Sequence, residues 1–423
     1  MNIPIQSSTM PTPDRFSVSQ AQERILASLP EKSLETEKVP LSQANGRILA
    51  ESLISPMDVP SFNSAAMDGF AFKAATLDLS QKQTLKIVGH AYAGHPFTGS
   101  LAEGECIQIM TGAVVPDGCD TVVQQEDISL LEDGWIMVPA KTATVGDNIR
   151  PVGENLKKDA PMLKAGTQLK PQHLGLLASV GLAEVPVFKK LAVTVFSTGD
   201  ELCPIGTSLE TGKIYDSNRI ILISLLEQLG CDVMDMGIIE DKPEKLEQAL
   251  RDAAHKADVI ITSGGVSVGA ADYTKQVMAK LGGIDFWSVR MRPGRPMAFG
   301  KILTENRETL LFGLPGNPVA AMISFLFFVR NALLVLMGTT PQYPQALTAI
   351  SSSDIRKKTG RTEFQRGFTH FQDGRLHVRL TGNQGSGIIQ SLTDADCIIC
   401  LPEDHGHVKT GSPVEIFLMD SLL

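Results

Sequence analysis

Compact apolar segments alternate with segments of helical periodicity between Leu191 and Leu314, and this alternation constrains the fold more than any other feature of the chain. The apolar run at residues 191–196 predicts a strand, and the leucines between 222 and 229 recur at the spacing of one helix face. Alternation of this kind is typical of a parallel sheet wrapped by helices. The other predicted strands are residues 232–236, 258–262, 286–289 and 310–314, and the other predicted helices contain residues 246–253 and 273–281.

The rest of the chain has a different pattern of apolar and turn-forming residues. Residues 55–152 carry short apolar runs between Gly, Pro and Asp clusters, which is typical of a small β domain. A capped helix is predicted before this segment at Ser17, and a second helix after it at Pro171. Strand-like runs return beyond Gly338, and 423 residues are too many for one core. We therefore predict a discontinuous helical domain (16–54 and 153–190), an inserted small β domain (55–152), an α/β domain (191–338) and a C-terminal β domain (339–423).

Three successive strands of the predicted sheet end in turns that carry acidic residues. These residues are Glu201, Asp241 and Asp272. Ligands bind outside the carboxyl ends of the strands in an open α/β sheet, so we expect the three carboxylates to face one crevice. Clustered carboxylates repel one another and normally hold a divalent cation, and Mg²⁺ bridging phosphates fits. Asp241 and Asp272 could alternatively act only as helix N-caps.

Two further segments near these turns are suited to anions. The Ser-Gly-Gly loop at residues 263–265 offers backbone N–H groups at a strand-to-helix junction, which suits a phosphate. Arg292 and Arg295 stand on a proline-stiffened turn, and residues 313–318 then open a helix, so that guanidinium groups beside a helix N-terminus predict an oxyanion site. A solvated surface turn is the alternative explanation for the arginines. The glycine spacing matches neither the dinucleotide-binding fingerprint nor a Walker loop.

The composition argues against several classes of protein. Apolar residues make up 43% and charged residues 20% of the chain, which is typical of a soluble globular protein. The formal net charge is −9 and no long run of Lys and Arg occurs, so we expect no nucleic-acid partner. The strongest membrane candidate begins at Pro318 but is interrupted by Arg330, which favours a buried helix. Residues 1–15 are polar, do not resemble a secretory signal and predict a disordered lead.

Six scattered cysteines favour small buried side chains in a reducing compartment, and therefore a cytoplasmic protein. Cys397 and Cys400 are three residues apart on a predicted strand, so they should point to opposite faces, which argues against a metal or redox pair. His405 and His407 flank a glycine beside acidic residues, which favours a turn.

Taken together, these segments resemble the molybdopterin molybdenumtransferase family, whose eukaryotic relative is the E domain of gephyrin. The resemblance extends in chain order over nearly the whole sequence. Some positions depart from the family pattern. Asn155 stands in place of Asp, and the sequence Asn-Ser-Ala-Ala at residues 63–66 stands in place of Asp-Asn-Ser-Ala. Arg292 and Arg295 stand in place of Lys, which keeps the charge but changes the hydrogen-bond geometry. The matching stretches are residues 47–50, 56–70, 109–113, 116–120, 196–202, 214–218, 263–275, 292–300, 313–318 and 360–367.

The resemblance implies an elongated homodimer of four-domain subunits, with an α/β domain shared with the pterin adenylyltransferases and a C-terminal β barrel. It implies that adenylylated molybdopterin and molybdate are converted to molybdenum cofactor and AMP, with Mg²⁺ required. It also implies the molybdopterin adenylyltransferase and molybdoenzyme maturation proteins as partners, and neither nucleic acid nor a membrane.

The resemblance further implies roles for individual residues. Glu201, Asp241 and Asp272 would hold Mg²⁺ or position the pyrophosphate. Asp68 and Thr111 match functional positions of the small β domain, which in such dimers is expected to reach the α/β crevice of the partner, although Asp68 before a glycine could be only a turn residue. The residues implied in binding pterin, phosphate or molybdate are Ser263, Gly264, Gly265, Ser267, Lys275, Arg292, Arg295, Pro315, Pro318, Arg366 and Ser391.

Two other functions remain open at this level. A nucleotide-processing hydrolase on the same α/β domain would release nucleotide without molybdate, but it leaves the two β domains unexplained. A non-catalytic scaffold would bind a partner without turnover, and the three acidic residues argue against it.

Overall fold

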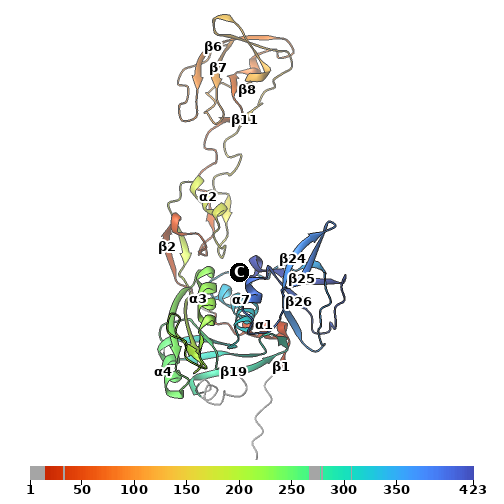
Figure 1. The fold of residues 1–423 in the computed structure, drawn as a ribbon. Helices are drawn as coiled ribbons and strands as arrows, with labels where there is room; N and C mark the ends of the chain where they lie inside the picture. Colours follow the sequence, from red (N-terminus) through yellow and green to blue (C-terminus); the bar gives the residue numbers. More distant parts are fainter. Residues whose placement is uncertain (1–14, 32–33, 266–276, 278–279, 306) are drawn as a thin grey trace, which may run out of the picture. The chain divides into compact units, whose positions relative to one another are not determined.

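The computed structural model describes residues 15–31, 34–265, 277, 280–305 and 307–423 (Figure 1). The chain divides into two compact units. The larger unit comprises Met1–Glu37, Gly46–Ala50 and Pro186–Leu423, and the smaller unit comprises Lys38–Asn45 and Glu51–Val185. The finer division into four domains stays a prediction.

A seven-stranded mixed sheet is the centre of the larger unit. Its strand order is β1-β19-β21-β22-β18-β14-β17, in which β17, β14, β18 and β22 are parallel. The prediction of a wholly parallel sheet is wrong at the other edge, because β21 runs antiparallel to both β19 and β22. Short turns connect these strands, and only antiparallel neighbours can be joined so directly. The strands are β1 (Arg15–Phe16), β14 (Ala192–Thr198), β17 (Asp232–Ile239), β18 (Val259–Ser263), β19 (Gly282–Val289), β21 (Pro296–Leu303) and β22 (Glu308–Leu314).

Helices cover both faces of this sheet. Successive residues of a strand point to opposite faces, so Val259 and Ile261 join the core beside α3 (Ser217–Leu229), whereas Ile260 joins the core beside α4 (Pro243–Ala254). α1 (Val18–Ala27) packs on the α3 side and begins with the predicted capping box, in which Ser17 and Gln20 satisfy each other's backbone N–H groups.

The apolar helix that begins at Pro318 is longer than predicted. It continues as α6 (Pro318–Ser324), a π-helical segment (Phe325–Val329) and α7 (Arg330–Leu336), so Arg330 does not end it. Its length and hydropathy would suffice to cross a membrane, but 78% of its apolar window is buried inside the fold. The predicted buried helix is therefore confirmed.

A closed β barrel follows the helix. Its strands β24-β25-β23-β27-β26 form a ring that closes through pairing of β26 with β24. The short strand β20 (Met291–Arg292) adds to β24, and this pairing carries Arg292 to the barrel. Cys397 packs inside the barrel core, whereas Cys400 packs against the core of the sheet, in agreement with their predicted opposite directions. The barrel strands are β23 (Leu347–Ser351), β24 (Thr362–Gln372), β25 (Arg375–Leu380), β26 (Cys397–Leu401) and β27 (Pro413–Leu418), with the short helices α8 (Gln390–Thr393) and α9 (Met419–Leu422).

The smaller unit contains a six-stranded sheet in the order β8-β5-β7-β6-β10-β9. This confirms the predicted β character of residues 55–152, and the predicted second helix is α2 (Pro171–Ser179). The sheet strands are β5 (Gly69–Phe72), β6 (Gln83–Ala91), β7 (Glu105–Ile109), β8 (Thr121–Gln124), β9 (Ser129–Leu130) and β10 (Trp135–Val138). The remaining short strands of the chain are β2 (Thr36–Pro40), β3 (Leu53–Ile54), β4 (Ser64–Ala65), β11 (Ile149–Arg150), β12 (Pro161–Leu163), β13 (Glu184–Phe188), β15 (Leu202–Cys203) and β16 (Ile214–Tyr215).

Candidate functional site

A cavity of about 280 Å³ lies at the carboxyl ends of β14 and β18, where ligands of open α/β sheets bind. Ser217 and Asn218 at the start of α3 and Pro318 at the start of α6 contribute to it. The lining residues are Thr198, Glu201, Leu202, Ile214, Tyr215, Asp216, Ser217, Asn218, Ser263, Gly264, Gly316, Asn317, Pro318, Gly387 and Ile389.

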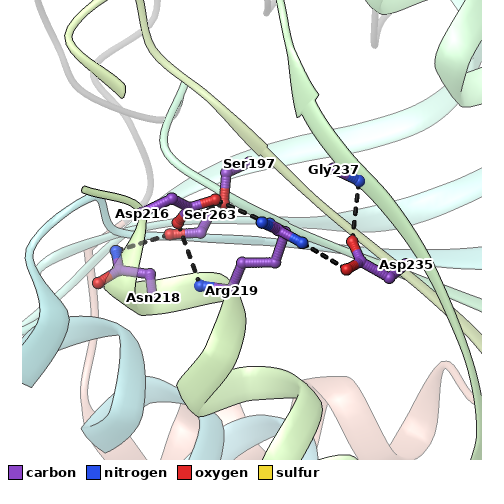
Figure 2. Close-up of polar contacts among 7 residues, drawn as sticks. All are labelled: Ser197, Asp216, Asn218, Arg219, Asp235, Gly237 and Ser263. Carbon is purple, nitrogen blue, oxygen red and sulfur yellow. Dashed lines mark hydrogen bonds and ion pairs between the residues drawn. The ribbon is translucent and has the colours of Figure 1, made fainter. Parts of the chain in front are cut away.

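A buried carboxylate fixes the start of α3 beside this cavity (Figure 2). Asp216 is 1% exposed and caps the helix by accepting from the backbone N–H of Arg219. The same carboxylate accepts from Ser197 Oγ at 3.1 Å and from Arg219 Nε at 2.9 Å. The Arg219 guanidinium also pairs with Asp235 on β17. The helix N-terminus is thereby tied to β14 and to β17.

Asn218 joins two loops of the cavity that are distant in sequence. Its Nδ2 donates to Ser263 Oγ at 2.8 Å and to the Gly316 carbonyl oxygen at 2.8 Å, and the residue is 8% exposed. These loops follow β18 and β22, which pair side by side. Because Ser263 Oγ accepts from Asn218, its own hydroxyl hydrogen is available to donate into the cavity.

The loop after β18 requires glycine at position 264. Gly264 has φ +93°, and an added Cβ would lie 2.3 Å from the Thr198 carbonyl oxygen. The Gly264 N–H donates to the Leu314 carbonyl at 3.1 Å, so this N–H is already occupied, although the sequence predicts that it binds phosphate. Ser263 Oγ, which lines the cavity, is therefore a better placed donor for a ligand.

The predicted acidic residues lie beside the cavity as far as the structure describes them. Glu201 lines it, and the pKa of Asp241 is raised by partial burial and by the neighbouring carboxylates of Asp200 and Glu201. Asp272, with Ser267 and Lys275, falls outside the described residues. Within the described part of the chain, no group of three His, Cys, Asp or Glu side chains is arranged as metal ligands.

A second cavity, of about 300 Å³, lies between the barrel and the turn after β20. Three guanidinium groups line it: Arg292, Arg356 and Arg366. Arg366 is 1% exposed, donates through Nε to Ser391 Oγ at 3.0 Å and donates through Nη2 to the Gly385 carbonyl at 3.1 Å. Burial, together with the charge of Arg292, lowers the pKa of Arg366 to about 10. No carboxylate of the described chain pairs with it, so the charge is uncompensated.

Other predicted ligand residues lie elsewhere. Arg295 is exposed and donates to Ser288 Oγ at 3.0 Å, and it lines neither cavity. Pro315 is buried before the first cavity, whereas Pro318 lines it.

Asp68 and Thr111 lie in the smaller unit and contact each other. Asp68 Oδ1 accepts from the Thr111 N–H at 2.8 Å and from Thr111 Oγ1 at 2.7 Å, and these bonds lower the pKa of Asp68. Thr111, which is exposed, thus keeps the half-buried carboxylate of Asp68 ionised.

The sequence predicted no role for Asp216, Asn218 and Arg356, which the structure places in the cavity walls. Asp216 and Asn218 belong to the stretch 214–218 that resembles the family, and this resemblance was the sequence feature that could have indicated a role for them. Arg356 belongs to no motif.

Family models match most of the chain. Residues 16–181 match the MoeA N-terminal region (domain I and II), residues 194–334 a probable molybdopterin binding domain, and residues 348–419 the MoeA C-terminal region (domain IV). The molybdopterin molybdenumtransferase of Haemophilus influenzae is 41% identical over 410 residues, which cover 96% of this chain and 100% of that protein. The chain belongs to the molybdopterin molybdenumtransferase family. It is thus an enzyme of molybdenum cofactor biosynthesis, and the predicted family membership is confirmed.

Other members of this family give the same result. The molybdopterin molybdenumtransferase of Bacillus subtilis is 34% identical over 396 residues, covering 92% of this chain and 91% of that protein. The crystal structure of the molybdopterin biosynthesis moeA protein from Pyrococcus horikoshii OT3 superposes with a TM-score of 0.81 at 29% identity, covering 96% of this chain and 100% of that chain. The multi-domain architecture is therefore that of the family.

Proposed function

We propose that the enzyme converts adenylylated molybdopterin and molybdate to molybdenum cofactor and AMP in a Mg²⁺-dependent reaction. The observation that carries the proposal is the uncompensated guanidinium of Arg366, buried in a cavity separate from the one at the strand ends. A buried charge without a counter-ion is unfavourable, and a bound oxyanion would relieve it. One cavity then receives the nucleotide-linked pterin and the other receives molybdate.

The first cavity suits the phosphates and pterin of the adenylylated substrate. Donors fixed in the cavity wall include the hydroxyl of Ser263, and Asn218 holds the two loops on either side of it. A phosphoanhydride held by such fixed donors is polarised without reorganisation of the site. Thr198 and Pro318 complete the wall.

The acidic residues beside this cavity fit a divalent cation. Partial burial and the neighbouring carboxylates of Asp200 and Glu201 raise the pKa of Asp241, and carboxylate oxygens are the ligands that Mg²⁺ prefers. Glu201 and Asp241, together with Asp272, would hold it. The bound ion would neutralise charge that develops on the departing AMP phosphate.

The second cavity suits molybdate. Arg366 and Arg292 would bind its oxygens, and Ser391 orients Arg366 through the Nε bond. Arg295 donates to Ser288 and lies outside the cavity wall, so we assign it a supporting charge only. Guanidinium groups in fixed positions bind tetrahedral oxyanions through paired hydrogen bonds.

The proposal extends to the assembly. We propose a cytoplasmic homodimer in which the ionised Asp68 with Thr111 of one subunit serves the α/β cavity of the other. The adenylyltransferase that makes the substrate and the proteins that mature molybdoenzymes are the proposed partners. The hydrogen bonds from Thr111 support a functional carboxylate at Asp68, since they keep it ionised.

The decisive experiment measures AMP released from purified adenylylated molybdopterin with and without molybdate, with tungstate in parallel. We expect AMP release to require molybdate and Mg²⁺ and to be lost in Asp272→Asn and Glu201→Gln variants that remain folded. Lys358→Ala, an exposed position outside both cavities, is the matched control. AMP release at the same rate without molybdate would assign the protein to the hydrolase alternative.

A further inference from the structure

The second cavity contains one arginine that no sequence motif singles out. Arg356 lines it together with Arg292 and Arg366, but the three differ in depth: Arg356 and Arg292 are exposed, whereas Arg366 is 1% exposed. The positive charges therefore extend from the cavity mouth to its interior.

The backbone holds Arg356 firmly at this mouth. Ile355, 1% exposed, exchanges two backbone hydrogen bonds with Val408, at 2.8 and 3.0 Å. Lys357, 8% exposed, donates through Nζ to the His405 carbonyl at 2.6 Å. Residues 355 and 357 are thus anchored, and the side chain between them is left on the exposed side.

The acidic residues of the cavity wall accept hydrogen bonds from groups other than the three arginines of the cavity. Glu363 accepts from Arg361 Nε and from Gln365 Nε2, each at 3.0 Å. Asp354 accepts from the N–H and the hydroxyl of Thr410. Within the described residues, neither acid pairs with an arginine of the cavity, so the cavity carries a net excess of cation.

We propose that Arg356 is the capture residue of this cavity: with Arg292 it binds the incoming tetrahedral oxyanion at the mouth and transfers it to Arg366 inside. The inference rests on the proposed function and adds to it a residue that sets the affinity for molybdate. Exposed charges at a cavity mouth raise the local concentration and association rate of an oppositely charged ligand. The arrangement therefore favours capture of molybdate when it is scarce.

The experiment measures binding of molybdate alone to the full-length protein by calorimetry, followed by molybdate KM and kcat for AMP release. Arg356→Ala should raise both Kd and KM about tenfold, as for loss of one charge-assisted contact, with kcat within about twofold. Arg356→Lys should restore most of the affinity, and Lys358→Ala should leave it unchanged. The salt dependence of Kd should be weaker in Arg356→Ala.

Each remaining outcome is decisive. If Arg356→Ala binds molybdate as the wild type does, with an unchanged salt dependence, the capture role is overturned and the proposed function stands. If the wild type binds no molybdate and releases no AMP in response to it, the proposed function itself fails. Equal binding of inorganic phosphate would assign the cavity to a phosphate group and overturn the assignment to molybdate.

Discussion

Replacing the buried Arg366 by methionine should lower the free energy of unfolding by no more than about 1 kcal/mol while abolishing the response of the protein to molybdate. Methionine has a similar unbranched stem, so the substitution removes the charge without opening a large cavity. A buried, unpaired charge destabilises the folded state, and its removal offsets the hydrogen bonds to Ser391 and Gly385 that are lost.

The pKa of Arg366 sets the magnitude. Lowered to about 10, it corresponds to at most about 3 kcal/mol against the charged form, which solvent in the cavity reduces to about 1–2 kcal/mol. Because the folded-state pKa is the lower one, this penalty acts throughout neutral pH and disappears only above pH 10. Loss of the contacts to Ser391 and Gly385 costs about 1 kcal/mol each. The net change is a loss of about 0–1 kcal/mol in the free energy of unfolding.

Urea unfolding at pH 7, with and without molybdate, measures both effects. Molybdate at one hundred times its Kd should stabilise the wild type by about 2.7 kcal/mol and the methionine variant by nothing. Arg375→Met, at an exposed position on the barrel, should change neither quantity by more than about 0.5 kcal/mol. A loss of more than about 2 kcal/mol in Arg366→Met, with the molybdate response intact, would refute the reasoning.

Three further predictions concern the first cavity. Gly264→Ala, which places a Cβ 2.3 Å from a carbonyl oxygen at positive φ, should lower the free energy of unfolding by about 2 kcal/mol or more, whereas Gly283→Ala, where the added atom meets nothing, should be nearly neutral in urea unfolding. Asn218→Asp should weaken AMP binding about tenfold, because it replaces the amide that donates to the Gly316 carbonyl by a negative charge. Gln228→Glu, on the exposed side of α3, should leave AMP binding unchanged. Equal Kd values for AMP in Asn218→Asp and the wild type, measured by calorimetry, would exclude a positioning role for Asn218. Asp241→Asn should lose the rise in melting temperature produced by Mg²⁺. Because the folded-state pKa of Asp241 is raised, the wild type without Mg²⁺ should gain stability relative to the variant as pH falls through that pKa. Wild-type and variant melting temperatures that change in parallel from about pH 4 to 8 would contradict this effect of burial and neighbouring carboxylates.

Local patterns predicted those parts of the molecule whose causes are local. The capping box at Ser17 and the leucine face of α3 depend on residues three or four positions apart, and both are present. The acidic turn at Glu201 follows directly from the end of β14.

Features that depend on distant partners were not predictable in this way. Asn218 contacts residues 45 and 98 positions away in the chain, and a single sequence gives no sign of those distances. The direction of β21 depends on which neighbour it pairs with, and the prolines at 293 and 296 conceal its apolar character. Arg356 resembles any exposed arginine until the barrel places it beside Arg292 and Arg366.

Because β20 pairs with β24, two parts of the fold supply the arginines of the oxyanion cavity. Arg292 belongs to the segment between sheet strands β19 and β21, whereas Arg356 and Arg366 belong to the barrel region. Exchanging barrels between family members would therefore create a hybrid cavity in which most of the cationic wall is foreign. In such chimeras, the protein that donates the barrel would determine the preference between molybdate and tungstate. The protein that provides the sheet would determine recognition of the nucleotide.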